Sequence, residues 1–313
     1  MGFVSNFYGV SMWISKTNHP TCQPMRTTNM PAARVARPLS STLCAVAAVT
    51  CLVPLTFANP QADQSRQTTA MPDRTFTGMI IVGAISIPEF EGSADMTALP
   101  LIAGELRWGN NRYVALEGNG GRINLVDHER FEFGPAMSIT FGRDNEIESL
   151  KVRRLGEIDD AFDAGLFGAY NTPSPLRDGD MIRLSAQIMS DTSDVHEGSW
   201  GDISASYRAR VSDRLGVTLS TTVSYADDDY ASTYFSVTPA GAARSGLKAT
   251  IVEGGLKDVS LGLTAMYELT DRWSLFGIAE YSRLVGDFAD SPIVAVEGDK
   301  NQLTLGVGFG WKF

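Results

Sequence analysis

The strictest pattern in this sequence is the alternation of apolar with small or polar residues over positions 301–313. A repeat of two residues indicates a β-strand whose two faces meet different surroundings. An apolar face ending in aromatics, opposite a small and mostly uncharged face, is typical of a strand between lipid and a narrow aqueous lumen. A half-buried strand of a soluble sheet also alternates, so the rest of the chain has to decide. The apolar face holds Leu303, Leu305, Val307, Phe309, Trp311 and Phe313, and the other holds Gln302, Thr304, Gly306, Gly308, Gly310 and Lys312.

Several other segments alternate in the same way, most clearly 131–141, 202–211, 215–225 and 259–269. About ten residues suffice for a tilted strand to cross a bilayer. After position 58 no stretch of 18 consecutive apolar residues occurs, which excludes membrane-spanning helices from this part of the sequence. Two segments are ambiguous, 162–170 and 273–284. In the second, Phe276 and Ile278 share a face with Glu280.

We therefore predict an all-β fold, a transmembrane antiparallel up-and-down β-barrel of about 12 strands. An even number of strands is what a closed antiparallel bacterial barrel requires. An extra hairpin, 232–238 with 247–253, would give fourteen. The predicted strands are 77–87, 97–108, 111–117, 121–126, 131–142, 161–170, 181–190, 200–210, 215–225, 258–269, 273–284 and 301–312.

Connection lengths support this topology. With both ends of the barrel domain in the periplasm, the periplasmic turns are short except 171–180, and the outer loops are long except 118–120. Short inner turns and long outer loops are the usual asymmetry of such barrels. Aromatic residues concentrate near the predicted strand ends, as in the two aromatic girdles of membrane proteins. The tryptophans concerned are Trp108, Trp200, Trp273 and Trp311, alongside Tyr225, Tyr267 and Tyr281.

The first 58 residues have the layout of a long leader with a secretory signal peptide. An apolar block over 43–58 ends with small residues at the −3 and −1 positions, Thr56 and Ala58. A membrane anchor would need about 20 apolar residues, and this block is interrupted by Pro54. Initiation at Met25 or Met30 would give a signal of ordinary length. The predicted organisation is 1–58 leader and signal peptide, 59–75 flexible periplasmic lead-in, and 76–313 outer-membrane barrel.

The charge of the exported part excludes one class of partner. The whole chain carries a net charge of −10, and its first 58 residues contain four basic and no acidic residues. Cleavage would therefore leave a net charge of −14, which argues against nucleic acid, because phosphate binding needs clustered Lys and Arg. All three cysteines precede position 59, so the exported protein forms no disulfide.

The chain contains the segments Phe90–Asp95, Tyr234–Val237, Ser245–Leu247 and Tyr281–Val294 and ends in Phe313. Together these features resemble the MipA/OmpV family, the MltA-interacting proteins of Gram-negative outer membranes. The resemblance runs from about residue 78 to the end, and the sequence departs from the family pattern at Phe90, Ser236 and Arg244. It implies an outer-membrane barrel that joins a murein transglycosylase to a penicillin-binding protein as a scaffold, with no residue identified as the partner contact. Phe313 resembles the terminal residue of the strand read by outer-membrane assembly machinery.

Candidate chemical groups are few. A hydrolase needs a nucleophile, a base and an orienting group within hydrogen-bond reach. After the leader the chain offers only His128 and His196, which the topology places in turns at opposite ends. We expect both to be solvated turn histidines. The acidic run 227–229 has oxygen ligands suited to a divalent cation, but a solvated loop tip is the simpler interpretation, as it is for Asp191, Asp194 and Glu197.

Two features bear on whether the lumen is open. The segment 286–294 is richer in apolar residues than an exposed loop, so it either plugs the lumen or packs on the rim. Charged residues of both signs are expected to face the lumen, where they line a channel or pair across a filled interior. We predict a non-enzymatic scaffold with outer-membrane lipid around it and no catalytic, metal or cofactor residue. The alternatives are a narrow diffusion pore and an envelope enzyme such as a lipase. The lumen candidates are Arg183, Asp202, Arg208, Arg210, Glu268, Glu280 and Lys312.

Overall fold

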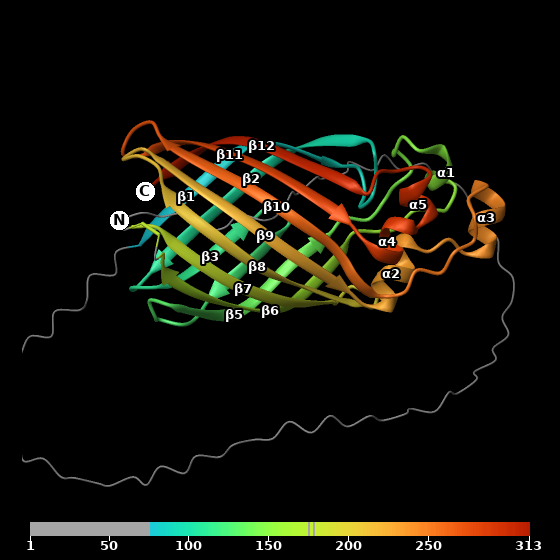
Figure 1. The fold of residues 1–313 in the computed structure, drawn as a ribbon, viewed down its shortest axis with the longest axis horizontal. Coiled ribbons are helices and arrows are strands. Elements are labelled where there is room, and N and C mark those ends of the chain that lie inside the picture. The colour runs from blue at the N-terminus through green and yellow to red at the C-terminus, as the bar shows by residue number, and fades with distance from the viewer. Residues whose placement is uncertain (1–75, 175, 178) are drawn as a thin grey trace, which may run out of the picture. The chain divides into compact units, whose positions relative to one another are not determined.

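The computed structural model describes residues 76–174, 176–177 and 179–313, which form twelve antiparallel strands closed into one barrel (Figure 1). Each strand pairs with its neighbours in sequence, and the first pairs with the last to close the ring. This confirms the predicted up-and-down barrel. The strands are β1 Thr77–Pro88, β2 Met96–Trp108, β3 Arg112–Glu117, β4 Gly120–Asn124, β5 Phe131–Thr140, β6 Ala161–Pro173, β7 Met181–Asp191, β8 Ser199–Arg210, β9 Leu215–Ala226, β10 Gly255–Glu268, β11 Trp273–Leu284 and β12 Asn301–Lys312.

The two exceptions to the predicted loop asymmetry have different outcomes. β6 extends beyond the predicted residue 170 and pairs with β7 as far as Pro173 and Met181, so the long turn 171–180 shortens to 174–180. A short connection between β3 and β4 is real. It turns at Gly118, whose φ of +75° is readily available only to glycine. The two strands that it joins are themselves short, six and five residues.

Five short helices gather at one end of the barrel, which we call the loop end (Figure 1). The opposite end, where β1 begins and β12 finishes, is called the turn end. Among the residues described, no helix is long and apolar enough to cross a membrane. The helices are α1 Leu150–Arg153, α2 Asp228–Phe235, α3 Pro239–Ser245, α4 Gly286–Asp290 and α5 Pro292–Ala295.

The fourteen-strand alternative is wrong, because the chain between β9 and β10 folds into helices α2 and α3. The side chain of Asp227 caps α2 by accepting from the backbone N–H of Tyr230 at 3.1 Å. α3 has a Thr238 cap followed by Pro239 in its first turn, the arrangement that favours helix initiation. Only a single antiparallel bridge, Val237 with Thr250, remains of the proposed hairpin.

The predicted faces of the strands are confirmed. On β12 the large apolar side chains from Leu303 to Trp311 point outward and are exposed, while Gly308 and Gly310 lie on the buried inner face. The inner glycines leave room for apolar side chains of the flanking strands. A Cβ atom on Gly308 would lie 3.0 Å from Cγ2 of Ile81, and one on Gly306 would lie 2.9 Å from Cγ2 of Ile278.

One sector of the lumen is apolar, which explains the ambiguous β11 pattern. Phe276 is buried on the inner face and clusters with Met79, Ile81, Leu101 and Met266. Apolar residues on both faces of a strand hide its alternation. Of the four tryptophans that were predicted to lie in the aromatic girdles, Trp200 does not lie there. Its indole Nε1 donates to Oδ2 of Asp163 at 3.1 Å, so this ring belongs to the interior.

The predicted leader 1–58 and lead-in 59–75 lie outside the described residues.

Candidate functional site

Apolar side chains from four connections, 89–95, 141–160, 227–254 and 285–300, pack together at the loop end, and we call this unit the cap. One cluster joins α2 to α4 and α5, where the rings of Phe235 and Phe288 meet edge to face with centroids 5.0 Å apart. A second cluster joins Phe90, Ile147 and Ile293 with residues of the 227–254 connection. Side chains this deeply buried hold the connections together as one packed unit. The 286–294 segment is therefore part of the cap.

The segments that carry the family resemblance meet in the cap. Phe90, Phe235, Leu247 and Ile293 are all buried there, although they are far apart in sequence. The hydroxyl of Ser291 donates to the backbone carbonyl of Phe235 at 2.6 Å and ties α5 to the end of α2.

Arg244, one of the departures from the family pattern, also joins two connections of the cap. Its guanidinium donates to the carbonyls of Arg154 and Leu155 at 3.1 and 3.0 Å. The residue therefore holds α3 against the segment that follows α1.

A buried charged group links the cap to the barrel wall. Lys257 of β10 forms an ion pair with Glu91 of the first connection, and Glu91 also accepts from the hydroxyl of Tyr230 at 2.9 Å. Burial raises the pKa of the Tyr230 phenol well above its usual value, so this hydroxyl stays protonated and remains a donor at neutral pH. These contacts tie α2 to the first connection and to β10.

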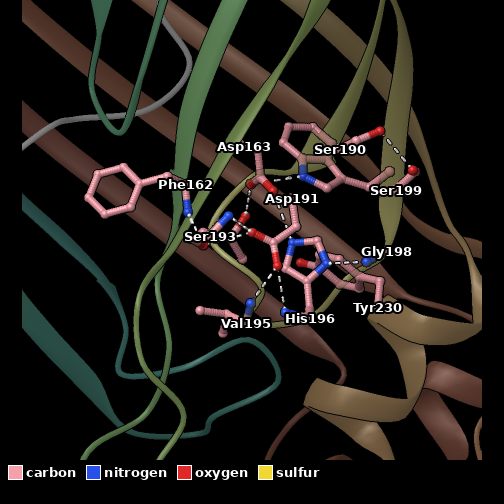
Figure 2. A network of polar contacts seen from close by, with 12 residues as sticks. Phe162, Asp163, Ser190, Asp191, Ser193, Val195, His196, Gly198, Ser199 and Tyr230 are labelled. Atoms are coloured by element: carbon pink, nitrogen blue, oxygen red, sulfur yellow. Dashed lines mark hydrogen bonds and ion pairs between the residues drawn. The ribbon is translucent and has the colours of Figure 1, made fainter.

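The connection between β7 and β8 is fastened to the interior by His196, which we call the latch (Figure 2). His196 is only 2% exposed, so the expectation of a solvated turn histidine is wrong for this residue. Its Nδ1 accepts the N–H of Gly198 at 3.1 Å, which leaves the ring proton on Nε2. Nε2 faces Oδ1 of Asp163 on β6 at 2.9 Å. The ring also contacts Tyr230 and Tyr234 of α2.

Asp191 folds the latch connection around its own carboxylate. Oδ2 accepts the backbone N–H groups of Val195, His196 and Glu197, at 2.7, 2.7 and 2.9 Å. Oδ1 accepts from both the N–H and the hydroxyl of Ser193, each at 2.7 Å. Asp191 is therefore not part of a solvated acidic loop, whereas Asp194 and Glu197 are exposed as expected.

Ligand atoms of Asp163, Asp191 and His196 lie within 4.8 Å of one another, the arrangement of a metal site. Each is already used, however. Asp163 accepts from Thr140, Trp200 and His196 at 2.6, 3.1 and 2.9 Å. Both ring nitrogens of His196 are engaged in hydrogen bonds, with Asp163 and with Gly198. The cluster is a satisfied hydrogen-bond network that shapes the loop.

The other acidic run and the other histidine have structural positions. Asp227 caps α2 and also accepts the N–H of Ser199 at 2.7 Å, and Asp228 accepts the N–H of Gly254 at 2.6 Å. The 227–229 run therefore begins a helix instead of forming a loop tip, although Asp228 and Asp229 are exposed as expected. His128 lies in an exposed turn, where Nδ1 accepts the N–H of Arg130 at 3.0 Å, in agreement with the prediction.

The latch gives a direct test. Asp163→Asn should destabilise the barrel by about 1–3 kcal/mol. The amide has only one acceptor oxygen, so in either orientation its N–H₂ group meets donors: the Thr140 hydroxyl and Trp200 indole, or the His196 imidazole. We expect faster limited proteolysis within 192–198 and a lower urea midpoint in detergent. Asp194→Asn, in the same connection but exposed, should leave both unchanged. Equal cleavage rates for Asp163→Asn and the wild type would contradict the latch.

A second polar network occupies the turn-end half of the lumen. Arg183 of β7 pairs with Glu132 of β5 at 2.6 Å. Glu132 also accepts from the hydroxyl of Tyr113 at 2.5 Å and from the amide of Asn171 at 2.7 Å. Glu105 pairs with Arg107 on the same strand, β2. Glu117 of β3 pairs with Arg122 of β4. The three ion pairs lie within one strand, between neighbouring strands, and between β5 and β7.

The predicted lumen residues are only partly brought together. Asp202 accepts from Gln187 at 2.6 Å, and Lys312 pairs with Glu268 at 2.6 Å near the turn end. Arg210 is exposed at the strand terminus. Sequence reasoning missed Asp163, Glu91 and Glu132 as organising carboxylates. Strand parity would have placed Asp163 and Glu132 inside, whereas Glu91 lies on a connection whose path only the folded chain fixes.

Comparison with known proteins agrees with this architecture. The family model of the MltA-interacting protein MipA matches residues 80–313. "Putative outer membrane protein YiaT" of Escherichia coli (strain K12) is 27% identical over 131 residues, which are 42% of this chain and 51% of that protein. This chain thus spans about half the length of that curated relative.

Among solved structures, an outer membrane channel from Pseudomonas putida F1 aligns with a TM-score of 0.40 at 12% identity, covering 80% of this chain and all of that one. The NanC porin aligns with a TM-score of 0.38 at 7% identity, covering 75% of this chain and 100% of that chain. The family model covers most of the chain and the whole barrel from the fourth residue of β1. The chain therefore belongs to the family of the MltA-interacting protein MipA, and it is a β-barrel of the outer membrane.

Proposed function

We propose that this protein is a closed, non-enzymatic barrel that serves as a structural platform in the cell envelope. On this proposal its turn end faces the periplasm and holds a murein transglycosylase together with a penicillin-binding protein. The family supports the transglycosylase as a partner, because its description is that of a protein interacting with MltA. The second enzyme follows from the resemblance of the sequence motifs to this family.

The observation that carries the proposal is the cap. Four connections meet over the loop end in clusters that bury Phe235, Phe288 and Ile293 almost completely. A pore for solutes needs a continuous aqueous path, and apolar side chains packed this closely leave no room for water between them. A barrel closed in this way is suited to presenting a fixed surface to other proteins.

A measurement of ion conductance distinguishes the platform from the alternative function, a narrow diffusion pore. Purified protein in a planar bilayer should give no steady single-channel steps in salt solution. A parallel preparation of a known porin shows that the bilayer reports channels. Regular steps from the wild-type protein would establish a pore and remove the closed platform.

Partner binding is tested by retention on the immobilised, detergent-folded barrel. Purified murein transglycosylase should be retained above an unrelated outer-membrane barrel of similar size, and the penicillin-binding protein should be retained with it. If neither enzyme is retained above that control, the platform role fails. Loss of a hydrolytic activity on changing His128 or His196 would instead revive the envelope-enzyme alternative.

A further inference from the structure

Arg183 has more donors than its neighbours accept. It is only 8% exposed, and its Nη1 is engaged by Glu132 at 2.6 Å and Asn171 at 3.4 Å. Its Nε and Nη2 are buried without a hydrogen-bond partner. Leaving such groups unpaired costs free energy, which is why buried donors in native proteins usually have partners.

Two more unpaired donors lie on the next strands. Nε of Arg208 on β8 and the hydroxyl of Thr218 on β9 are both buried without a partner, and Thr218 is 5% exposed. The register places Arg208 directly opposite Thr218 and Arg183 opposite Ser206, two residues from Arg208 on the same face. Directly and diagonally opposed side chains of adjacent strands are within reach of each other. The unpaired donors therefore gather on one lumen wall.

The same part of the lumen holds four arginines but only three carboxylates to pair with them. Each of three inward carboxylates pairs with one arginine, and the three hydrogen-bond donors around Glu132 leave its oxygens little capacity for another. Among the described residues, none forms an ion pair with Arg208. Arg208 is thus the excess cation of this set. The arginines are Arg107, Arg122, Arg183 and Arg208, and the carboxylates are Glu105, Glu117 and Glu132.

We propose that Arg183, Arg208 and Thr218 form a binding site for a small oxyanion, a carboxylate or phosphate group. Guanidinium groups bind planar or tetrahedral oxyanions through paired N–H donors, and a hydroxyl adds a further donor. All three residues lie within four positions of the turn end of their strands, so the ligand enters from that side. The site is independent of the platform role, since it needs only the barrel.

Calorimetric titration of the detergent-folded barrel with inorganic phosphate and with acetate, against chloride at matched ionic strength, tests the site. Saturable binding of phosphate or acetate is expected, and it identifies which of the two groups is preferred. Arg208→Gln should weaken it by about 10-fold or more, because it removes a charge-assisted hydrogen bond. Arg272→Gln removes the same charge from an exposed turn at the same end and should bind as the wild type does.

Thr218→Val provides a second readout that does not need Arg208. It replaces an unpaired hydroxyl by a methyl group of similar size, so without anion the variant should be at least as stable as the wild type. With phosphate or acetate it should gain less thermal stability. Heat-modifiable migration on a gel verifies that each variant is folded. Absence of saturable binding, equal binding of chloride, or unchanged affinity in the folded variants would overturn the site.

Discussion

Replacing Phe288 by alanine is expected to open the cap while leaving the barrel intact. The ring is fully buried and meets Phe235 edge to face at 5.0 Å. Removing a buried phenylalanine costs about 3–5 kcal/mol through lost burial and the cavity left behind. The cost falls on the helices of the loop end, because the ring belongs to the cap cluster and the barrel has its own ladder of backbone hydrogen bonds.

The measurement is limited proteolysis of the 227–254 and 285–300 connections. Cleavage that proceeds through local opening should accelerate by on the order of 100-fold or more. Heat-modifiable migration should persist, because it reports the closed barrel. Val296→Ala, in the same connection at a side chain that is 61% exposed, should cleave at the wild-type rate. Unchanged protection in Phe288→Ala would show that the connections do not depend on this core.

Leu219→Arg is expected to impair folding of the barrel into lipid. Leu219 lies near the middle of β9 and is 55% exposed on the outer face, where the surrounding medium is hydrocarbon. An arginine facing lipid at the bilayer midplane costs about 2–4 kcal/mol in a β-barrel. The free energy of unfolding from phospholipid vesicles, followed by urea titration, should fall by this amount.

Ile251→Arg is the matched control for the lipid-facing change. Ile251 is 85% exposed in the connection between β9 and β10, at the loop end, where the side chain meets water. Exposed substitutions of this kind usually change stability by less than about 0.5 kcal/mol. Equal stabilities of the two variants in vesicles would mean that the outer face of β9 does not meet hydrocarbon.

The strands were predicted from a single signal, the two-residue repeat of apolar residues. The prediction was accurate where the lumen and the lipid differ in polarity. On β12 the inner face is small or polar throughout, so its ends agree with the prediction to within a residue. The signal weakened on β11, because Phe276 and Ile278 face an apolar sector of the lumen. It allowed an extra hairpin over 232–253, where α2 ends and α3 lies, because an alternating pattern does not exclude the helices that Asp227 and Thr238 cap.

The candidate site was much less predictable. His196 follows Asp194 and precedes Glu197, a sequence context that indicates a solvated turn. Its burial depends on Asp163, which is 33 residues away and approaches only after β6, β7 and β8 have paired. Arg208 and Thr218 were likewise assigned to their strands, but only the register places one opposite the other.

By itself, the sequence determined which side chains meet lipid and which meet the lumen, because a two-residue repeat assigns each residue to a face whatever its strand pairs with. The tertiary structure alone decided that the connections at the loop end pack into one cap. Ser291 reaches the carbonyl of Phe235 56 residues away, and Gln302 accepts from Gly92 across 210 residues. Contacts of this span form only when β12 returns to β1 and the ring of strands brings their connections together.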